Sequence, residues 1–115
     1  MPVTPKSTLL VYLCDGSLGW AHGRPWVELC LCGFTANSIS TYGSILKDKA
    51  KIDRFSIKHA EKYPRLYIGS RARALAFFAY IMRGGRIPKG YEYKFRGFIG
   101  DDFSKLRQSL VNAIP

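Results

Sequence analysis

An aspartate at the end of an apolar segment is the clearest candidate for chemistry in this sequence. Residues 9–14 (LLVYLC) are apolar, and Asp15, Gly16 and Ser17 follow directly. If the segment is a helix, one carboxylate lies at its end beside a glycine, and carboxylate oxygens are ligands that hard divalent cations prefer. Asp-Gly is also a common helix stop. Two interpretations of Asp15 therefore stay open: a metal ligand, or a residue that only ends a helix.

The cysteines and histidines do not indicate a zinc site. Cys14, Cys30 and Cys32 all lie in apolar segments, and His22 and His59 stand alone in the sequence. A structural zinc site needs four ligands at suitable spacing. We therefore expect three reduced thiols, packed as in a cytosolic protein, and no zinc.

The charge of the chain points to a polyanionic partner. The sequence holds 18 Lys and Arg against 8 Asp and Glu, a net charge of +10, while 47% of its residues are hydrophobic and can form a core. Each phosphate that a basic side chain neutralises releases condensed counterions, so a small domain of this charge favours nucleic acid. A ribosome-associated protein and a membrane-surface protein are the alternatives.

The length and the ends of the chain suggest one domain in the interior of a cell. The 115 residues suit a single nucleic-acid-binding domain over 1–115. The longest apolar run, residues 8–14, is far shorter than the ~20 residues of a membrane span. The start of the chain, residues 1–5, lacks the charged region and cleavage site of a secretory signal. We expect a cytoplasmic or organellar location, no secretion and no membrane partner.

Hydrophobic periodicity and capping residues predict the elements that must position Asp15. Thr4-Pro5 starts a helix that stops at Asp15-Gly16, Asn37 or Ser38 caps a second helix, and Ser70 caps a third that ends at Gly84-Gly85. Strands are predicted over residues 17–24, 26–34, 55–58 and 65–69, and a link over 86–94 precedes a last helical segment with Phe103, Leu106 and Leu110. The expected fold is α+β: an αββαββα unit with a four-stranded antiparallel sheet, helices on one face, and a C-terminal helix.

The predicted sheet has one apolar and one polar face. Alternation in the strands places on the apolar face Val27, Leu29, Leu31, Phe55, Ile57, Leu66 and Ile68, to be covered by helices that carry Ile39, Tyr42, Ile45, Leu46, Leu75, Phe78, Ile81 and Met82. The other face carries Glu28, Ser56, Lys58, Arg65 and Tyr67, with His22 and Arg24 as further candidates. This face is polar, basic and aromatic, and it is free to hold a ligand. Trp26 and Tyr67 either brace the sheet or touch bases.

Three segments together resemble the LAGLIDADG homing endonucleases. The apolar residues 9–18, which end in Asp15-Gly16-Ser17-Leu18, resemble the motif helix of that family. Residues 26–46, a strand followed by an amphipathic helix, and residues 63–82, which contain YPRLYIGS before an apolar helix, resemble the segments that follow it. The resemblance covers roughly residues 7–83.

This resemblance implies a homodimeric, sequence-specific DNA endonuclease. Asp15 and Gly16 would bind Mg²⁺ at the scissile phosphate, with Lys58 and Lys94 as the basic catalytic candidates. Two motif helices would meet through Leu9, Leu10, Leu13 and Cys14. The sheet would lie over duplex DNA, the preferred partner, through His22, Arg24, Glu28, Ser56, Lys58, Arg65, Tyr67, Arg86 and Lys89. Arg86 and Lys89 belong to a basic run over residues 71–96, which either contacts phosphates or is a solvated face.

The departures from the family favour a second hypothesis, a non-catalytic nucleic-acid-binding module on the same fold. Leu10 and Cys14 stand where the family has small residues, and Leu13 stands at the earlier acidic position. Residues 95–103 resemble a degraded second motif with Asp102 at the acidic place, or else a loop before a capped helix. The module would be a DNA-binding regulator or an RNA-binding protein. Asp15 favours the endonuclease, and the short chain favours the module.

Overall fold

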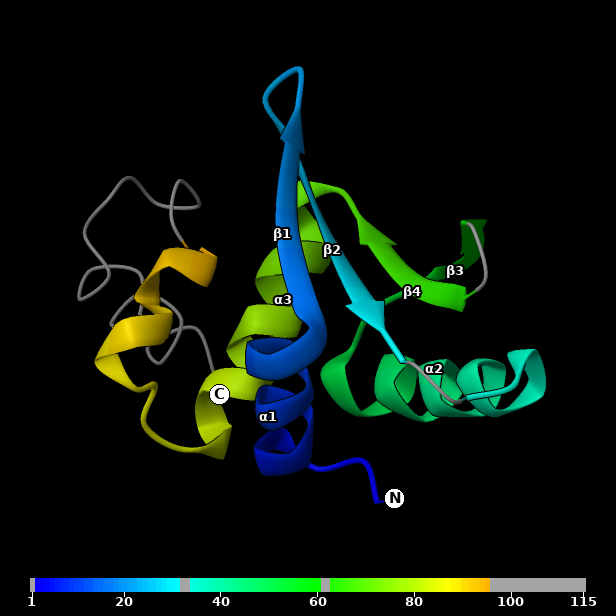
Figure 1. Ribbon diagram of the computed structural model, residues 1–115, viewed down its shortest axis with the longest axis horizontal. Helices are drawn as coiled ribbons and strands as arrows, with labels where there is room; N and C mark the ends of the chain where they lie inside the picture. Colours follow the sequence, from blue (N-terminus) through cyan, green and yellow to red (C-terminus); the bar gives the residue numbers. More distant parts are fainter. Residues whose placement is uncertain (1, 32–33, 61–62, 96–115) are drawn as a thin grey trace.

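A computed structural model describes residues 2–31, 34–60 and 63–95 of the chain. Figure 1 shows the elements, whose bounds are α1 (Pro5–Asp15), β1 (Gly16–Ala21), β2 (Arg24–Cys30), α2 (Ala36–Ala50), β3 (Ser56–Ala60), β4 (Tyr63–Gly69), α3 (Arg71–Ile81), and the 3₁₀ segments η1 (Met82–Gly84) and η2 (Lys89–Phe95). The expected α+β fold with an αββαββα order is confirmed. The predicted C-terminal helix and the segment around Asp102 lie outside the described residues. Within those residues, no helix is long and apolar enough to cross a membrane.

Short polar side chains start the three helices. Thr4 caps α1 in a capping box, because the Ser7 amide donates to Thr4 Oγ1 at 3.0 Å and the Thr4 amide donates to Ser7 Oγ at 3.1 Å. Ser70 caps α3 by accepting from the Arg73 amide at 3.3 Å. Both caps confirm the helix starts that were predicted from the sequence. The cap of α2 is a correction: it is Thr35, which accepts from the Ser38 amide at 3.1 Å, so this helix begins earlier than Asn37.

The sheet is antiparallel throughout, in the order β1-β2-β4-β3. A two-residue turn, His22-Gly23, joins β1 to β2, and both residues have positive φ, 52° and 75°. Such a turn matches the twist of a hairpin, and it makes β1 and β2 a continuous ribbon. The sequence did not predict this hairpin. It also placed the end of β2 too late, at residue 34 instead of Cys30.

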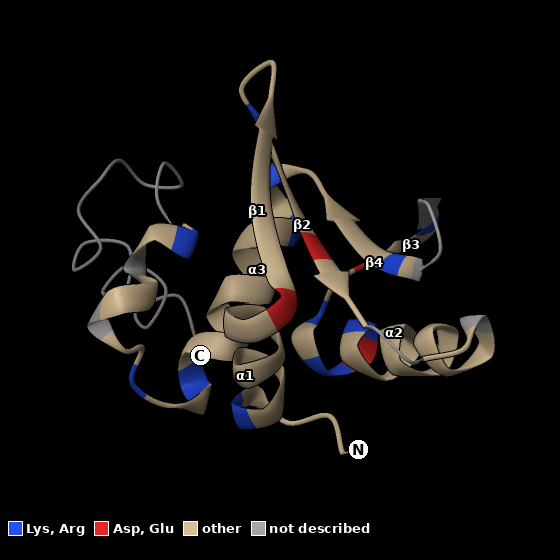
Figure 2. Cartoon of the chain, viewed as in Figure 1, with Lys and Arg blue, Asp and Glu red and all other residues tan. Residues whose placement is uncertain are grey.

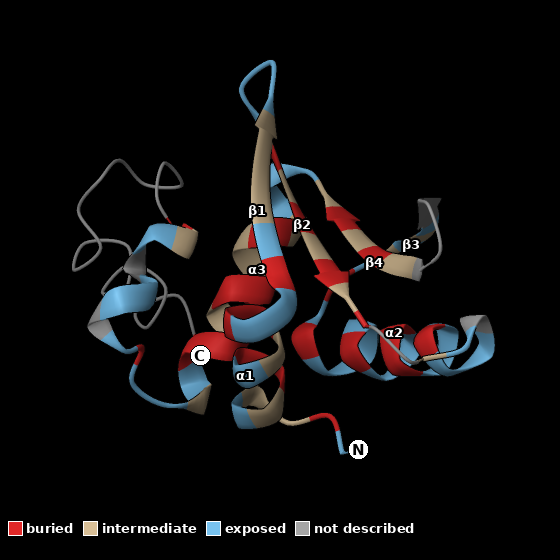
Figure 3. Cartoon of the chain, viewed as in Figure 1, coloured by how far each residue is buried: buried red, intermediate tan, exposed pale blue. Residues whose placement is uncertain are grey.

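The apolar face of the sheet is buried under the three helices. Val27, Leu29 and Leu66 are fully buried, and Ile68 is 1% exposed. Figure 1 shows α1, α2 and α3 on one side of the sheet, and Figure 3 shows buried residues alternating with more exposed ones along β2 and β4. The predicted register is therefore confirmed. Ile57 is half-buried because β3 is an edge strand, and Phe55, directly before β3, is half-buried as well. Ile45, predicted on the apolar side of α2, is instead exposed.

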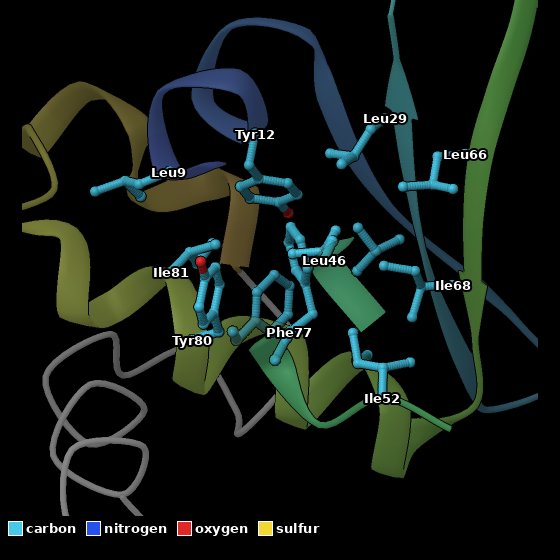
Figure 4. Close-up of a cluster of buried hydrophobic side chains, with 14 of the residues drawn as sticks. Leu9, Tyr12, Leu29, Leu46, Ile52, Leu66, Ile68, Phe77, Tyr80 and Ile81 are labelled. Carbon is cyan, nitrogen blue, oxygen red and sulfur yellow. The ribbon is translucent and has the colours of Figure 1, made fainter. Parts of the chain in front are cut away.

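Tyr12 of α1 lies at the centre of an aromatic cluster that joins α1 to α3 and η2. Its ring centroid is 5.6 Å from Phe77, 5.5 Å from Phe78 and 5.3 Å from Phe95. Figure 4 shows Tyr12 among the buried side chains of the helices and the sheet. The Tyr12 hydroxyl donates to the Lys94 carbonyl. Burial raises the pKa of Tyr12 above its usual value, with a smaller contribution from Tyr93, so the ring stays neutral.

We expect Leu29→Ala to lower the free energy of unfolding by about 2–5 kcal/mol, because it leaves a cavity between the sheet and the helices. The measurement is urea unfolding followed by circular dichroism. Leu10→Ala on α1 is the matched control, since Leu10 is 54% exposed and truncating it should change stability by only about 0.5 kcal/mol. Equal losses in the two variants would contradict the packing described here.

Candidate nucleic-acid interface

The outer face of the sheet forms an open groove of about 1170 Å³. The β1–β2 hairpin, strands β2, β3 and β4, and the start of α3 contribute its lining. We call this surface the groove; it is lined by Ala21, His22, Arg24, Pro25, Trp26, Glu28, Arg54, Phe55, Ser56, Lys58, Tyr67, Gly69, Ser70 and Arg73. Because side chains alternate along a strand, burial of the apolar face sends these polar and aromatic residues outward together.

Cations outnumber anions in the groove. In the part of the chain that the structure describes, the ion pairs are Arg65 with Glu28 at 3.3 Å and Arg73 with Asp53 at 2.6 Å. Arg24, Arg54 and Lys58 form none within those residues. In Figure 2 the acidic segment of β2 is red and the basic segment of the neighbouring strand β4 is blue. The single carboxylate in the lining is thus held by Arg65, and three cations stay available for an anionic ligand.

Asp53 fixes the guanidinium of Arg73 at the rim of the groove. Arg73 Nε donates to Asp53 Oδ1 at 2.6 Å, and Arg73 Nη2 donates to Oδ2 at 3.0 Å, so the contact is bidentate. This hydrogen bonding lowers the pKa of Asp53 from 3.8 to about 2. The sequence singled out Arg73 only as a member of a basic run. Its partner lies 20 residues away, and only the turn from β4 into α3 brings the two together.

Two aromatic side chains, Trp26 and Tyr67, form the floor of the groove, which we call the aromatic floor; Phe55 borders the groove, but its ring packs toward Gly43 of α2. Each of the three is half-buried. Lys58 Nζ lies 3.8 Å from the centre of the Tyr67 ring, a cation–π contact that places the ammonium over the floor. The floor and its cations together offer apolar surface and positive charge side by side.

The groove collects most of the nucleic-acid-binding residues that the sequence predicted. Its lining includes His22, Arg24, Glu28, Ser56, Lys58 and Tyr67. Arg65 lies beside it, on the same face, and pairs with Glu28. The sequence missed Arg54, and it left the role of Trp26 open. The signal for Arg54 was weak, a cation one residue before the aromatic start of a predicted strand.

Arg86 and Lys89 were also predicted to bind nucleic acid, and the structure does not bring them to the groove. The groove meets α3 at its first residues, whereas Arg86 and Lys89 follow α3 at its other end. From there the chain passes α1 and reaches β1 through η2. The described part of the basic run, residues 71–95, is therefore divided between two parts of the molecule, and only its start reaches the groove.

Asp15 and Lys94 come together, but Lys58 does not join them. Asp15 is exposed at the end of α1. Lys94 Nζ donates to the carbonyl of Tyr12 at 3.2 Å and to that of Gly16 at 2.9 Å. Burial lowers the pKa of Lys94, and the nearby Cys14 and Asp15 act in the opposite direction. Lys58 lies on the opposite edge strand, three strand spacings or about 14 Å away. Within one chain, Asp15 and Lys94 therefore lie apart from Lys58.

Within one chain, one of the two predicted magnesium ligands is already engaged by a cation. The Gly16 carbonyl, predicted as a ligand, already accepts a hydrogen bond from the Lys94 ammonium. The positive charge of Lys94 would repel a second cation at this place. Among residues 2–31, 34–60 and 63–95, no group of three His, Cys, Asp or Glu could hold a metal. Gly16 is extended (φ −92°, ψ 162°) at the start of β1, and a Cβ atom at Gly16 would lie 2.4 Å from the Tyr12 ring.

The predicted dimer interface on α1 is also corrected. Leu9 and Leu13 are 3% and 5% exposed and pack in the core of their own chain. Leu10 and Cys14 are exposed on the other side of the helix. Of the four residues, only these two are accessible to a second molecule.

Comparison of the chain with protein-family models, curated proteins and solved structures found no match. The resemblance to the LAGLIDADG family therefore stays a hypothesis from the sequence. The groove and its cations are the basis on which a function is inferred.

Acid should reveal the contribution of the Asp53–Arg73 pair to stability. A carboxyl with a lowered pKa stabilises the fold fully above its unfolded pKa, and that contribution is lost as the pH falls through the folded pKa. The stability difference between wild type and Asp53→Asn should therefore shrink between about pH 4 and pH 2, the unfolded and folded pKa values. Urea unfolding across this range measures it. In an Arg73→Gln background the acid-dependent part of the difference should be much smaller, because Arg73 is the largest cause of the lowered pKa; its persistence at full size would contradict the assignment.

Proposed function

We propose that this protein binds nucleic acid through the groove. The observation that carries the proposal is the set of three cations, Arg24, Arg54 and Lys58, that lie on one concave face without ion-pair partners in the described part of the chain. Phosphate contacts from such side chains fix the position of a nucleic acid and supply most of the electrostatic binding energy. The net charge of +10 adds long-range attraction.

Duplex DNA is the form of nucleic acid that we propose first. The β1–β2 hairpin extends beyond the rest of the sheet (Figure 1), and His22 and Arg24 lie at its tip. Two strands about 4.8 Å apart form a ribbon that a major groove about 12 Å wide admits. The hairpin would enter the major groove of the DNA. Arg54 and Lys58, which lie farther along the sheet of the protein, would contact phosphates. This arrangement separates positioning contacts from contacts to base edges.

Glu28 has a defined place in this arrangement. Its side chain is 19% exposed and its carboxylate accepts from Arg65 at 3.3 Å. An unpaired carboxylate would repel phosphates, and the guanidinium offsets that repulsion. The pair holds the Arg65 guanidinium beside the groove, whose lining contains Glu28. Glu28 therefore supports the interface by orienting a cation, although the sequence suggested direct contact.

DNA cleavage is the second candidate function, and one observation favours it. Asp15 is exposed at the end of α1, next to the exposed Leu10 and Cys14. Cleavage would need a second copy of the chain to add a carboxylate, because the described residues offer Asp15 alone at this place and the Lys94 ammonium occupies the Gly16 carbonyl. The geometry of one chain thus supports binding more strongly than cleavage.

Binding should weaken steeply with salt, because counterions return to the phosphates when the complex dissociates. We expect Arg54→Ala to reduce the slope of log affinity against log salt by about one and to weaken binding to all duplex sequences alike. Fluorescence anisotropy with labelled duplex DNA measures both. Lys6→Ala is the matched control, because Lys6 is exposed on α1 and does not line the groove. A salt-independent affinity, or equal effects of the two variants, would count against the proposal.

Asp15→Asn separates binding from cleavage. The variant keeps the size of the side chain and removes the charge that a divalent cation needs. If the protein only binds, wild type and variant should bind duplex DNA equally, and neither should cut it with Mg²⁺. The measurement is a cleavage assay on a library of duplex sites, with binding measured in parallel. Cutting by wild type that Asp15→Asn abolishes would establish the second candidate instead.

A further inference from the structure

Arg73 lines the groove, whereas the carboxylate that holds it lies outside the lining. Arg73 is in the first turn of α3, and Asp53 lies in the segment before β3. The pair therefore presents its cation to the groove and keeps its anion behind that cation. Among the basic side chains of the described lining, Arg73 is the one that an ion pair engages.

The contact with Asp53 uses one side of the Arg73 guanidinium and leaves its end unused. A guanidinium has five N–H donors. Asp53 accepts from Nε at 2.6 Å and from Nη2 at 3.0 Å, which leaves both donors of Nη1 and the second donor of Nη2. In the part of the chain that the structure describes, Nη1 forms no hydrogen bond and is not buried. The end of the guanidinium can therefore bind a second anion while Asp53 holds its side.

Asp53 has two opposite effects on an anionic ligand of the groove. Its negative charge repels phosphates, but its side chain is 71% exposed, so water and salt screen that charge. Its two hydrogen bonds hold a long, flexible side chain in one orientation, and an arginine that is already oriented loses less conformational entropy on binding. For one such side chain the saving corresponds to about two- to tenfold in affinity. Orientation therefore outweighs the screened repulsion.

We infer that Arg73 binds a phosphate of the duplex and that Asp53 is its positioning residue. This inference rests on the proposed function and adds to it a contact beyond the three cations without ion-pair partners. Asp53 holds the side of the guanidinium from outside the groove, and Nη1 and Nη2 donate to the oxygens of one phosphate. A carboxylate at the edge of the DNA-binding surface thus strengthens binding, although its charge alone predicts the opposite.

Asp53→Asn tests the inference by the sign of its effect. An asparagine has a similar size, but it offers one acceptor oxygen in place of two and carries no charge. The variant should bind labelled duplex DNA about two- to tenfold more weakly than wild type, although it has one negative charge less. Asp48→Asn is the matched control, because Asp48 is exposed on α2 and does not line the groove. Its affinity should equal or slightly exceed that of wild type. Fluorescence anisotropy at a fixed salt concentration measures both.

A second background shows whether Asp53 acts through Arg73. In Arg73→Gln no guanidinium is left to position, so Asp53→Asn should no longer weaken binding and should strengthen it slightly. If Arg73→Gln does not fold, Arg73→Lys gives the same comparison, since lysine keeps the charge but lacks the fork that a carboxylate binds at two nitrogens. Arg73→Gln alone should reduce the slope of log affinity against log salt by about one. Circular dichroism shows which variants are folded.

The outcomes distinguish this inference from the proposed function. If Asp53→Asn binds as tightly as wild type or more tightly, as Asp48→Asn does, the inference is overturned, while DNA binding through the groove stays intact and the Asp53–Arg73 pair serves only the stability of the fold. An equal weakening by Asp53→Asn with and without the Arg73 guanidinium would overturn it as well. Failure of wild type to bind duplex DNA would overturn both proposals.

Discussion

The burial of alternate side chains of β2 and β4 against three helices determines most of what this molecule offers to a ligand. Val27, Leu29, Leu66 and Ile68 lie in the interior. Since the side chains of a strand alternate between faces, their burial sends the intervening residues outward at fixed spacing. A slip of one residue in either strand would exchange the two faces. The stability of the core and the composition of the groove therefore have one origin.

A second constraint operates where α1 meets β1. Tyr12 and Lys94 are joined twice: the Tyr12 hydroxyl donates to the Lys94 carbonyl, and the Lys94 ammonium donates to the Tyr12 carbonyl. The ammonium thereby satisfies carbonyls at the end of α1, where the helix dipole favours a cation. Gly16 is needed there because the Tyr12 ring leaves no room for a Cβ atom. Residues that suggested a catalytic motif in the sequence thus have a structural explanation in the fold.

The sequence predicted those parts of the fold that depend on neighbours along the chain. The cap at Thr4, the cap at Ser70 and the alternation in β2 and β4 each follow from a few consecutive residues, and each was found correctly. The His22-Gly23 turn was missed because a histidine with positive φ is uncommon. The cap at Thr35 was missed because two other capping residues follow it closely.

The candidate site was less predictable because it depends on pairing between distant strands. Six predicted residues reached the groove: five lie in strands and share a face by alternation, and His22 lies in the turn between β1 and β2. The setting of Trp26 between Gly19 and Gly69 requires the register of three strands at once, which no local pattern contains. The same holds for the contact of Arg73 with Asp53. The sequence placed Lys94 near Asp15, and the structure brings the two close together. Nothing in the sequence indicated the Tyr12 and Gly16 carbonyls that bind the Lys94 ammonium.

The position of Lys58 in β3 has a consequence for the behaviour of the protein in concentrated solution. In the described sheet β3 is an edge strand, and its outer backbone groups are a template on which another chain could add a strand. A lysine in the middle of a short edge strand discourages such pairing, because a second copy would bring two ammonium groups together. The same cation that faces the groove thus also protects the sheet from self-association. A substitution of Lys58 would therefore change both the charge of the groove and the protection of the edge strand.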